Sequence, residues 1–95
     1  MRAFTVVDDD PAFLDSLRRI EPPGYDWTSK IRTAAFVLRS NPEAGAATQD
    51  DAVRILYFAA TPGHPGLKIF YNVEGTTVTL LRGRPFDRFH EAGEI

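Results

Sequence analysis

Basic side chains concentrate in the second half of this 95-residue chain, where they are suited to bind an anionic group. Residues 53–90 carry five basic and two acidic side chains, whereas residues 1–52 carry six basic and nine acidic ones. The whole chain has a net charge of −2, which argues against generic binding to nucleic acid. A chance distribution of so few charges is the alternative interpretation. The basic residues of this half that we single out are Arg54, Lys68, Arg82 and Arg84.

Histidine and aspartate supply two further sets of reactive side chains. The imidazole of His90 can take up or release a proton near neutral pH, which suits general acid–base catalysis. His64 lies between a glycine and a proline, so we expect an exposed loop residue there. Aspartates fill residues 8–10, and an aspartate before Pro11 is a typical helix cap.

The composition excludes or disfavours several classes of protein. The chain has no cysteine, so disulfides and thiolate metal sites are excluded. No stretch approaches the roughly 20 apolar residues of a membrane-spanning helix, and the apolar run at the N-terminus is too short for a signal peptide. With 43% apolar and 25% charged residues, the sequence predicts one globular domain over residues 1–95. We expect a cytoplasmic protein with no metal and no cofactor.

The first half of the chain predicts one short strand and two helices. The expected bounds are a strand at residues 3–7, a helix from Asp10-Pro11 to Ile20, and a second helix from Thr28 or Ser29, either of which could cap it, to Arg39. Apolar residues recur at helical spacing in both segments. They are Phe13, Leu14, Leu17 and Ile20 in the first, and Ile31, Ala34, Ala35 and Leu38 in the second, widened by Phe36 and Val37.

The second half predicts three strands that form an antiparallel meander from about Val53 to Arg84. The expected strands are residues 53–59, 67–73 and 76–82, with loops at 43–51 and 61–66. The Glu74-Gly75 pair indicates a two-residue hairpin turn. Gly83 and Pro85 interrupt the last strand, and residues 86–95 form a polar tail. The order β-α-α-β-β-β predicts an α+β fold with two helices packed on a small sheet.

The register of the last two strands decides which basic residues can meet. The expected turn pairs Val73 with Thr76, Tyr71 with Val78, Ile69 with Leu80 and Leu67 with Arg82. Because side chains alternate between faces, Arg82 then points away from Lys68. If Gly83 bulges or ends the strand, Arg84 turns toward Lys68. We therefore favour Arg84 over Arg82 as the partner of Lys68.

The first twenty residues resemble the start of a response-regulator receiver domain. A strand that leads into the aspartates at 8–10 and Pro11 matches the place where that family holds magnesium. The resemblance ends at Ala59 and Ala60, where the family carries a phosphoacceptor aspartate. The chain is also too short for five strand–helix units, so we expect the aspartates to cap the first helix.

Most of the chain, from about Leu14 to Phe89, resembles the RelE/ParE superfamily of bacterial toxins. The element order agrees with that family. The local similarities are the helix exit at 38–45 with its Asn41-Pro42-Glu43, the strand opening at 53–57, the tyrosine-containing strand at 67–73, and the last strand at 78–84, which ends in glycine and a basic residue. The ordered set carries the resemblance, rather than any one motif.

This resemblance implies an endoribonuclease that cleaves messenger RNA on the ribosome without a metal ion. The ribose 2′-hydroxyl attacks the adjacent phosphate, so the reaction needs a proton acceptor, a proton donor and cations for the phosphate. By their match to the family's positions, the implied catalytic residues are Lys68, Arg84 and His90. The implied RNA-binding residues are Arg54, Arg82 and Phe89, with Phe89 able only to stack on a base.

Other functions remain open for the same scaffold. The ParE branch poisons DNA gyrase by binding alone and needs no catalytic residues, and a degenerate member would have no toxicity. A truncated receiver-like domain is a further alternative. The toxin interpretation implies a partner, a cognate antitoxin that wraps the toxin and adds a strand or helix to its surface. Convergence of Lys68, Arg84 and His90 on one site distinguishes the ribonuclease from the alternatives.

Overall fold

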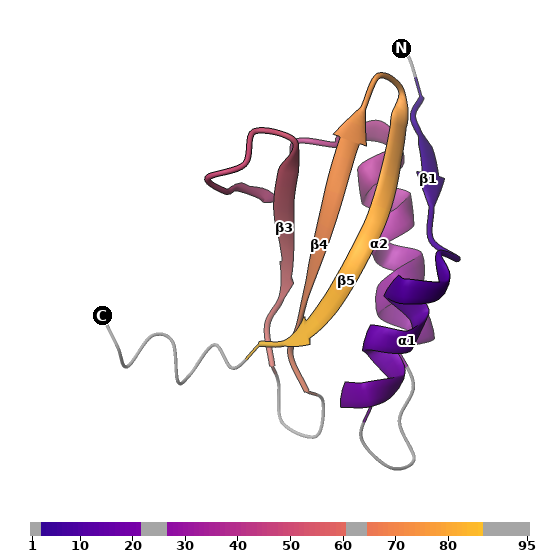
Figure 1. Ribbon diagram of the computed structural model, residues 1–95, viewed down its shortest axis with the longest axis vertical. Helices are drawn as coiled ribbons and strands as arrows, with labels where there is room; N and C mark the ends of the chain where they lie inside the picture. The colour runs from indigo at the N-terminus through magenta and orange to yellow at the C-terminus, as the bar shows by residue number, and fades with distance from the viewer. Residues whose placement is uncertain (1–2, 22–26, 61–64, 87–95) are drawn as a thin grey trace.

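Two helices and a five-stranded sheet make up the computed structural model, which describes residues 3–21, 27–60 and 65–86. The helices are α1 (Pro11–Ile20) and α2 (Thr28–Ser40). The strands are β1 (Thr5–Val7), β2 (Ala46–Ala47), β3 (Val53–Phe58), β4 (Leu67–Glu74) and β5 (Thr77–Pro85). The α+β class that the sequence predicts is confirmed (Figure 1). No helix of these segments is long and apolar enough to cross a membrane.

The sheet has the order β1-β5-β4-β3-β2 and is mixed rather than purely antiparallel. The predicted meander is confirmed, since β3, β4 and β5 pair antiparallel in sequence order. β1 adds to its edge in parallel with β5. β2 lies within a stretch predicted to be loop, and that prediction is wrong at Ala46 and Ala47. The hydroxyl of Thr48 donates to the carbonyls of Asp50 and Val53, and this local turn folds the alanines back onto β3.

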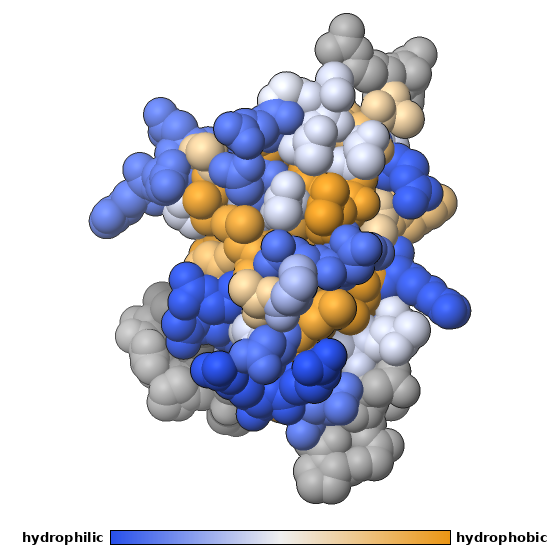
Figure 2. Space-filling model, turned by 45° about the vertical axis from the view of Figure 1, so that its right-hand side comes forward, coloured by the Kyte–Doolittle hydropathy of each residue, from blue (hydrophilic) through white to orange (hydrophobic). Residues whose placement is uncertain are grey.

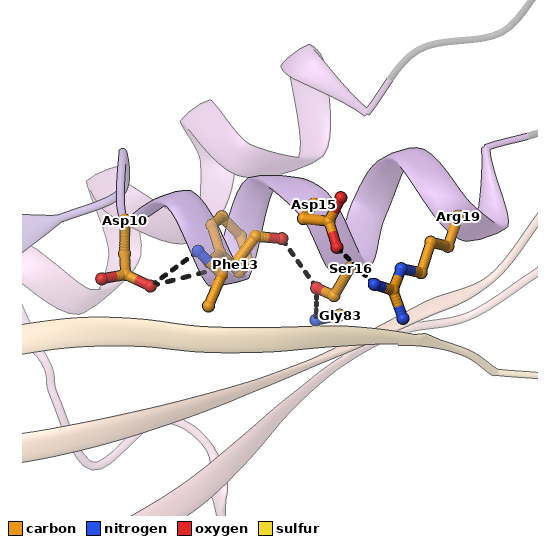
Figure 3. A network of polar contacts seen from close by, with 7 residues as sticks. Asp10, Phe13, Asp15, Ser16, Arg19 and Gly83 are labelled. Carbon is orange, nitrogen blue, oxygen red and sulfur yellow. Dashed lines mark hydrogen bonds and ion pairs between the residues drawn. The ribbon is translucent and has the colours of Figure 1, made fainter.

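The start of α1 follows the sequence signal, whereas α2 begins at Thr28 as predicted but without the predicted cap. Asp10 Oδ2 accepts hydrogen bonds from the backbone N–H groups of Ala12 and Phe13, as expected for a capping aspartate before proline (Figure 3). The residue at the cap position of α2 is Trp27, which makes no side-chain cap. The predicted cap at Thr28 or Ser29 is therefore wrong. Burial of Trp27 positions this helix start instead, and its indole N–H donates to the Leu17 carbonyl.

Both helices pack on the same face of the sheet. The buried core joins residues of α1 and α2 to the inward side chains of β4 and β5, namely Phe13, Leu17, Trp27, Ala34, Leu38, Leu67, Ile69, Tyr71, Val78 and Leu80. The predicted apolar stripe of α2 was too wide, because Phe36 is 74% exposed. In Figure 1, β3, β4 and β5 lie in front of α2, so the opposite face of the sheet is turned toward the viewer.

A short polar network joins α1 to β5 at Gly83. The Ser16 hydroxyl donates to the Phe13 carbonyl at 2.7 Å and accepts from the Gly83 N–H at 2.9 Å (Figure 3). A Cβ atom at Gly83 would lie 2.3 Å from Leu17 Cδ2, so this close approach requires glycine. The prediction that Gly83 interrupts the strand is wrong, because Ser16 satisfies its outward amide and β5 continues to Pro85.

The helices do not cover the whole edge of the hydrophobic core, and some apolar side chains there remain partly exposed. On the side of the molecule that bears β1 and α1, a band of apolar surface runs between hydrophilic residues above and below it (Figure 2). Partly buried apolar side chains pack against the core, among them Phe4, Val6, Leu14, Ile20 and Ile31.

Candidate nucleic-acid interface

The hairpin between β4 and β5 turns one residue later than predicted. Glu74 pairs with Thr77, so Gly75 and Thr76 form the turn and Val73 faces Val78. Gly75 has a φ of 59°, and a glycine at the first central position is the arrangement of type II′ hairpin turns. The predicted register, in which Val73 faces Thr76, is therefore wrong. The dipeptide indicated a hairpin correctly but allowed two positions for the turn.

A β-bulge in β5 places the two arginines of this strand on the face opposite the helices. Tyr71 pairs with Leu80 and Phe70 pairs with Arg82, which leaves Leu81 without a Cα partner on β4. A regular ladder would have turned Arg82 and Arg84 toward the core. The extra residue reverses that alternation. The bulge that we predicted at Gly83 thus occurs two residues earlier, and it does bring Arg84 beside Lys68.

One row of cross-strand neighbours joins β3, β4 and β5 near one end of the sheet. Lys68 pairs with Tyr57 on one side and with Arg84 on the other. Directly opposite residues have Cβ atoms about 4.5–5.5 Å apart, so the two cationic side chains leave the sheet as close neighbours. Like charges at such positions are destabilising. Two adjacent cationic groups are also suited to bind one anion between them.

Aromatic rings flank this cationic pair. In the next row, Phe70 pairs with Arg82, whose Cζ lies 5.7 Å from the centre of the Phe70 ring, within the range of a cation–π contact. At the end of the first row, the ring centres of Tyr57 and Phe86 are 4.9 Å apart with an angle of 56° between planes. We refer to Tyr57, Lys68, Phe70, Arg82, Arg84 and Phe86 together as the basic-aromatic face.

The charge of this side of the sheet changes along the strands. Lys68, Arg82 and Arg84 lie at the end where β3 and β5 finish. Glu74 lies at the hairpin end of β4, six residues from Lys68 and on the same side by alternation. At about 3.3 Å per residue this separation is roughly 20 Å, which exceeds the screening length of physiological salt. The cationic end is therefore electrostatically distinct from Glu74.

Arg54, predicted as an RNA contact, lies on the other side of the sheet. It pairs with the buried Tyr71, and its Nε donates to the Gly45 carbonyl at 3.0 Å. The Tyr71 hydroxyl accepts from the Gly45 N–H and donates to the Pro42 carbonyl. Arg54 thus holds the chain that leaves α2, and the structure does not bring it to the basic-aromatic face. Desolvation by burial raises the pKa of the Tyr71 phenol.

The predicted site residues Phe89 and His90 fall outside the described residues, so the structure does not place them. Tyr57 is not among the predicted site residues, and the structure adds it to the row of Lys68 and Arg84. Its position opposite Lys68 could be found from the sequence only with the β3–β4 register. Among the residues with described positions, no group of three or more histidine, aspartate and glutamate side chains is arranged to hold a metal ion.

A groove of about 400 Å³ lies on the other flank of the same arginines, between α1 and β5. Its strand wall consists of residues 82–85, and its helix wall includes Ser16 and Arg19. Arg19 forms an ion pair with Asp15 at 2.8 Å (Figure 3). Part of the positive charge on the helix wall is thereby neutralised.

Comparisons with protein-family models, with curated proteins and with solved structures give no significant match for this chain. The site is therefore argued from its own geometry. The antiparallel meander of β3, β4 and β5 is incompatible with a receiver domain, whose sheet is built from parallel strand–helix units. Asp10 caps α1, as the alternative interpretation of the aspartates predicted.

Proposed function

We propose that this protein is a toxin of the RelE/ParE type that binds messenger RNA on its basic-aromatic face and cleaves it. The observation that carries the proposal is the direct cross-strand pairing of Lys68 with Arg84 on the side of the sheet away from both helices. Two cations held side by side on rigid strands form a receptor for one phosphate group. Arg82, in the neighbouring row, supplies a third positive charge.

The proposed reaction is an internal transesterification of RNA. The 2′-oxygen attacks the adjacent phosphorus and the bond from phosphorus to the 5′-oxygen breaks, which leaves a 2′,3′-cyclic phosphate and a 5′-hydroxyl. Lys68 and Arg84 stabilise the charge that builds up on the phosphate oxygens in the transition state. His90 is the residue that we assign to one of the two proton transfers, and solvent serves the other.

The acidic character of the whole chain is compatible with this proposal because the positive charge is local. Binding to RNA depends on the cations that contact phosphates, whereas net charge mainly affects long-range encounter. The cross-strand neighbours Lys68 and Arg84 bring two positive charges together, and a phosphate bound between them would interact with both.

The proposal includes a location and partners. Messenger RNA on the ribosome is the substrate, the cytoplasm is the compartment, and a cognate antitoxin is the inhibitor. The test for the antitoxin is co-purification of the product of a neighbouring reading frame with this protein. Growth rescue when both proteins are expressed together would support it.

Substitution of the cationic pair tests the proposed reaction. Wild-type protein added to translating ribosomes should cleave their messenger RNA and leave a 2′,3′-cyclic phosphate end. We expect Lys68→Ala and Arg84→Ala each to lower the cleavage rate by about 100-fold or more, since each removes a group that stabilises transition-state charge. Arg32→Ala is the matched control, because Arg32 is exposed on α2 and lies away from this face.

The same variants separate the proposed function from its alternatives. Induced expression in bacteria should arrest growth with the wild type and the control, but not with the two site variants. Growth arrest without RNA cleavage would overturn the ribonuclease and indicate binding alone, with DNA gyrase as the target to assay. Normal growth with wild-type protein would contradict toxicity altogether.

A further inference from the structure

We infer that Tyr57, braced by Phe86, forms a base-stacking subsite beside the phosphate site, so that the protein selects single-stranded RNA. This inference rests on the proposed function and specifies its substrate. Tyr57 lies directly across β4 from the cationic pair, since Lys68 pairs with it on one side and with Arg84 on the other. Phosphate and base positions would therefore occupy one row of the sheet.

The Tyr57 ring has the exposure and support of a stacking platform. The residue is 44% exposed, which makes it one of three large hydrophobic residues at the surface of the described chain. The Phe86 ring contacts it at 4.9 Å with tilted geometry, which restricts its orientation. A partly exposed ring that a neighbour already holds in place loses little conformational entropy when a base stacks on it.

The neighbouring charges favour a nucleotide over an apolar partner. Adjacent strands are about 4.8 Å apart. Lys68 is on the strand next to that of Tyr57, and Arg84 is on the strand beyond it. A nucleotide whose phosphate lies between the two cations has its base within reach of the tyrosine ring. Aromatic rings next to cations are the general means by which proteins hold single-stranded nucleic acid.

A second position for base stacking lies in the neighbouring row of the sheet, at Phe70 and Arg82. The Arg82 guanidinium lies over the Phe70 ring, and a guanidinium plane fixed in this way can itself stack on a base. Bases in a duplex are already paired and stacked, so neither position is accessible to double-stranded RNA. The predicted preference is thus for unpaired nucleotides, with little dependence on base identity.

The experiment measures binding of a short single-stranded RNA, blocked at the cleavage site by a 2′-deoxy nucleotide, to wild-type and variant proteins. Two matched oligonucleotides each carry one abasic nucleotide, either directly 3′ or directly 5′ to the blocked site. Stacking of one base contributes about 5- to 100-fold in affinity. We expect Tyr57→Ala to weaken binding by that factor, Tyr57→Phe to bind within about twofold of wild type, and Tyr57→Leu, which keeps apolar volume, to resemble Tyr57→Ala.

A double cycle separates stacking from a structural effect. If Tyr57 stacks on a base, Tyr57→Ala should weaken binding of the intact oligonucleotide but not of the one that lacks the stacked base. Equal weakening of both, or equal binding of duplex and single strand by wild type, would overturn the inference. Lys68→Ala and Arg84→Ala should weaken both oligonucleotides. No binding of any RNA by wild type would instead refute the proposed function itself.

Discussion

At the residue scale, Tyr71 links the sheet to the segment that leaves α2. Its side chain is fully buried, and its hydroxyl accepts from the Gly45 N–H at 2.9 Å and donates to the Pro42 carbonyl at 2.7 Å. Arg54 reinforces the same segment through the Gly45 carbonyl. These contacts show that Tyr71 on β4 and the segment from Pro42 to Gly45 after α2 stabilise each other. This structural role does not depend on any catalytic role.

Removal of this hydroxyl gives a prediction with a pH signature. We expect Tyr71→Phe to lower the free energy of unfolding by about 1–3 kcal/mol, because two buried partners lose their hydrogen bond. The folded pKa of Tyr71 is raised by burial, so the unfolded phenol ionises first as pH rises past about 10. The unfolded state then binds fewer protons, and stability falls with pH.

The measurement is urea unfolding of wild type and Tyr71→Phe at a series of pH values from 8 upward. The difference in stability should be constant below the unfolded pKa, about 10, and should shrink above it. A difference that does not change across this range would contradict the prediction. Tyr57→Phe is the control, since its ring is partly exposed and no hydrogen bond of its hydroxyl contributes to this network.

At the element scale, the approach of α1 to β5 depends on the absence of a side chain at Gly83. The Gly83 N–H donates to Ser16, and Leu17 fills the space where a Cβ would lie. This contact sets where α1 crosses the strand that bears Arg82 and Arg84. The helix therefore supports the basic-aromatic face from behind.

Substitution at this contact should show strong coupling between the two elements. We expect Gly83→Ala to destabilise the fold by about 1–3 kcal/mol through overpacking against Leu17. In a Leu17→Val background, which lacks the clashing Cδ2 methyl, the same substitution should cost less than half as much. The measurement is a double-mutant cycle by chemical unfolding. Additive costs would contradict the direct steric contact.

The β5 bulge is the element that decides the site. If Leu81 paired regularly with Phe70, alternation would put Arg82 and Arg84 toward the helices and Gly83 toward solvent. Because Leu81 is instead left without a partner on β4, the glycine faces Leu17 and both arginines face outward. One unpaired residue thus satisfies the packing of α1 and the clustering of positive charge together.

At the scale of the whole molecule, local charge and net charge have opposite signs. The chain carries −2 in total, whereas the basic-aromatic face gathers Lys68, Arg82 and Arg84. If RNA binding depends on this face, charge changes elsewhere should have little effect at physiological ionic strength, where the screening length is about 8 Å.

Two substitutions by glutamine, one of an arginine and one of a glutamate, test whether local charge or net charge controls RNA binding. We expect Arg84→Gln to weaken RNA binding and to reduce the slope of log affinity against log salt by about 0.7, the value for one phosphate contact with a single strand. Glu74→Gln makes the protein less acidic but lies roughly 20 Å from Lys68 along β4, so affinity should stay within about twofold. A larger gain from Glu74→Gln than loss from Arg84→Gln would show that net charge controls binding.

Local chemistry in the sequence predicted much of this fold. The Asp10-Pro11 start of α1, the apolar spacing of both helices and the three strands of the meander depend on interactions between residues close in sequence, and all were confirmed. The cap position of α2 and the two-residue β2 were missed, because burial of Trp27 positions the helix start and the turn at Thr48 brings Ala46 and Ala47 onto β3.

The candidate site was predictable in composition but not in arrangement. Lys68 and Arg84 followed from charge distribution and resemblance, and their pairing required a bulge somewhere in the last strand. The position of the turn at Gly75-Thr76 and of the bulge at Leu81 did not follow, because several registers keep apolar residues on one face. Phe89 and His90 remain predictions.

The helices, the strands other than β2, their order and the basic half of the chain could all be predicted from the sequence. Each of these depends on side-chain chemistry over a few neighbouring positions. The tertiary structure alone decided that Tyr57, Lys68 and Arg84 share one row while Arg54 lies behind the sheet. The physical reason is that cross-strand register is set by non-local packing, here of Leu17 on Gly83 and of Tyr71 in the core.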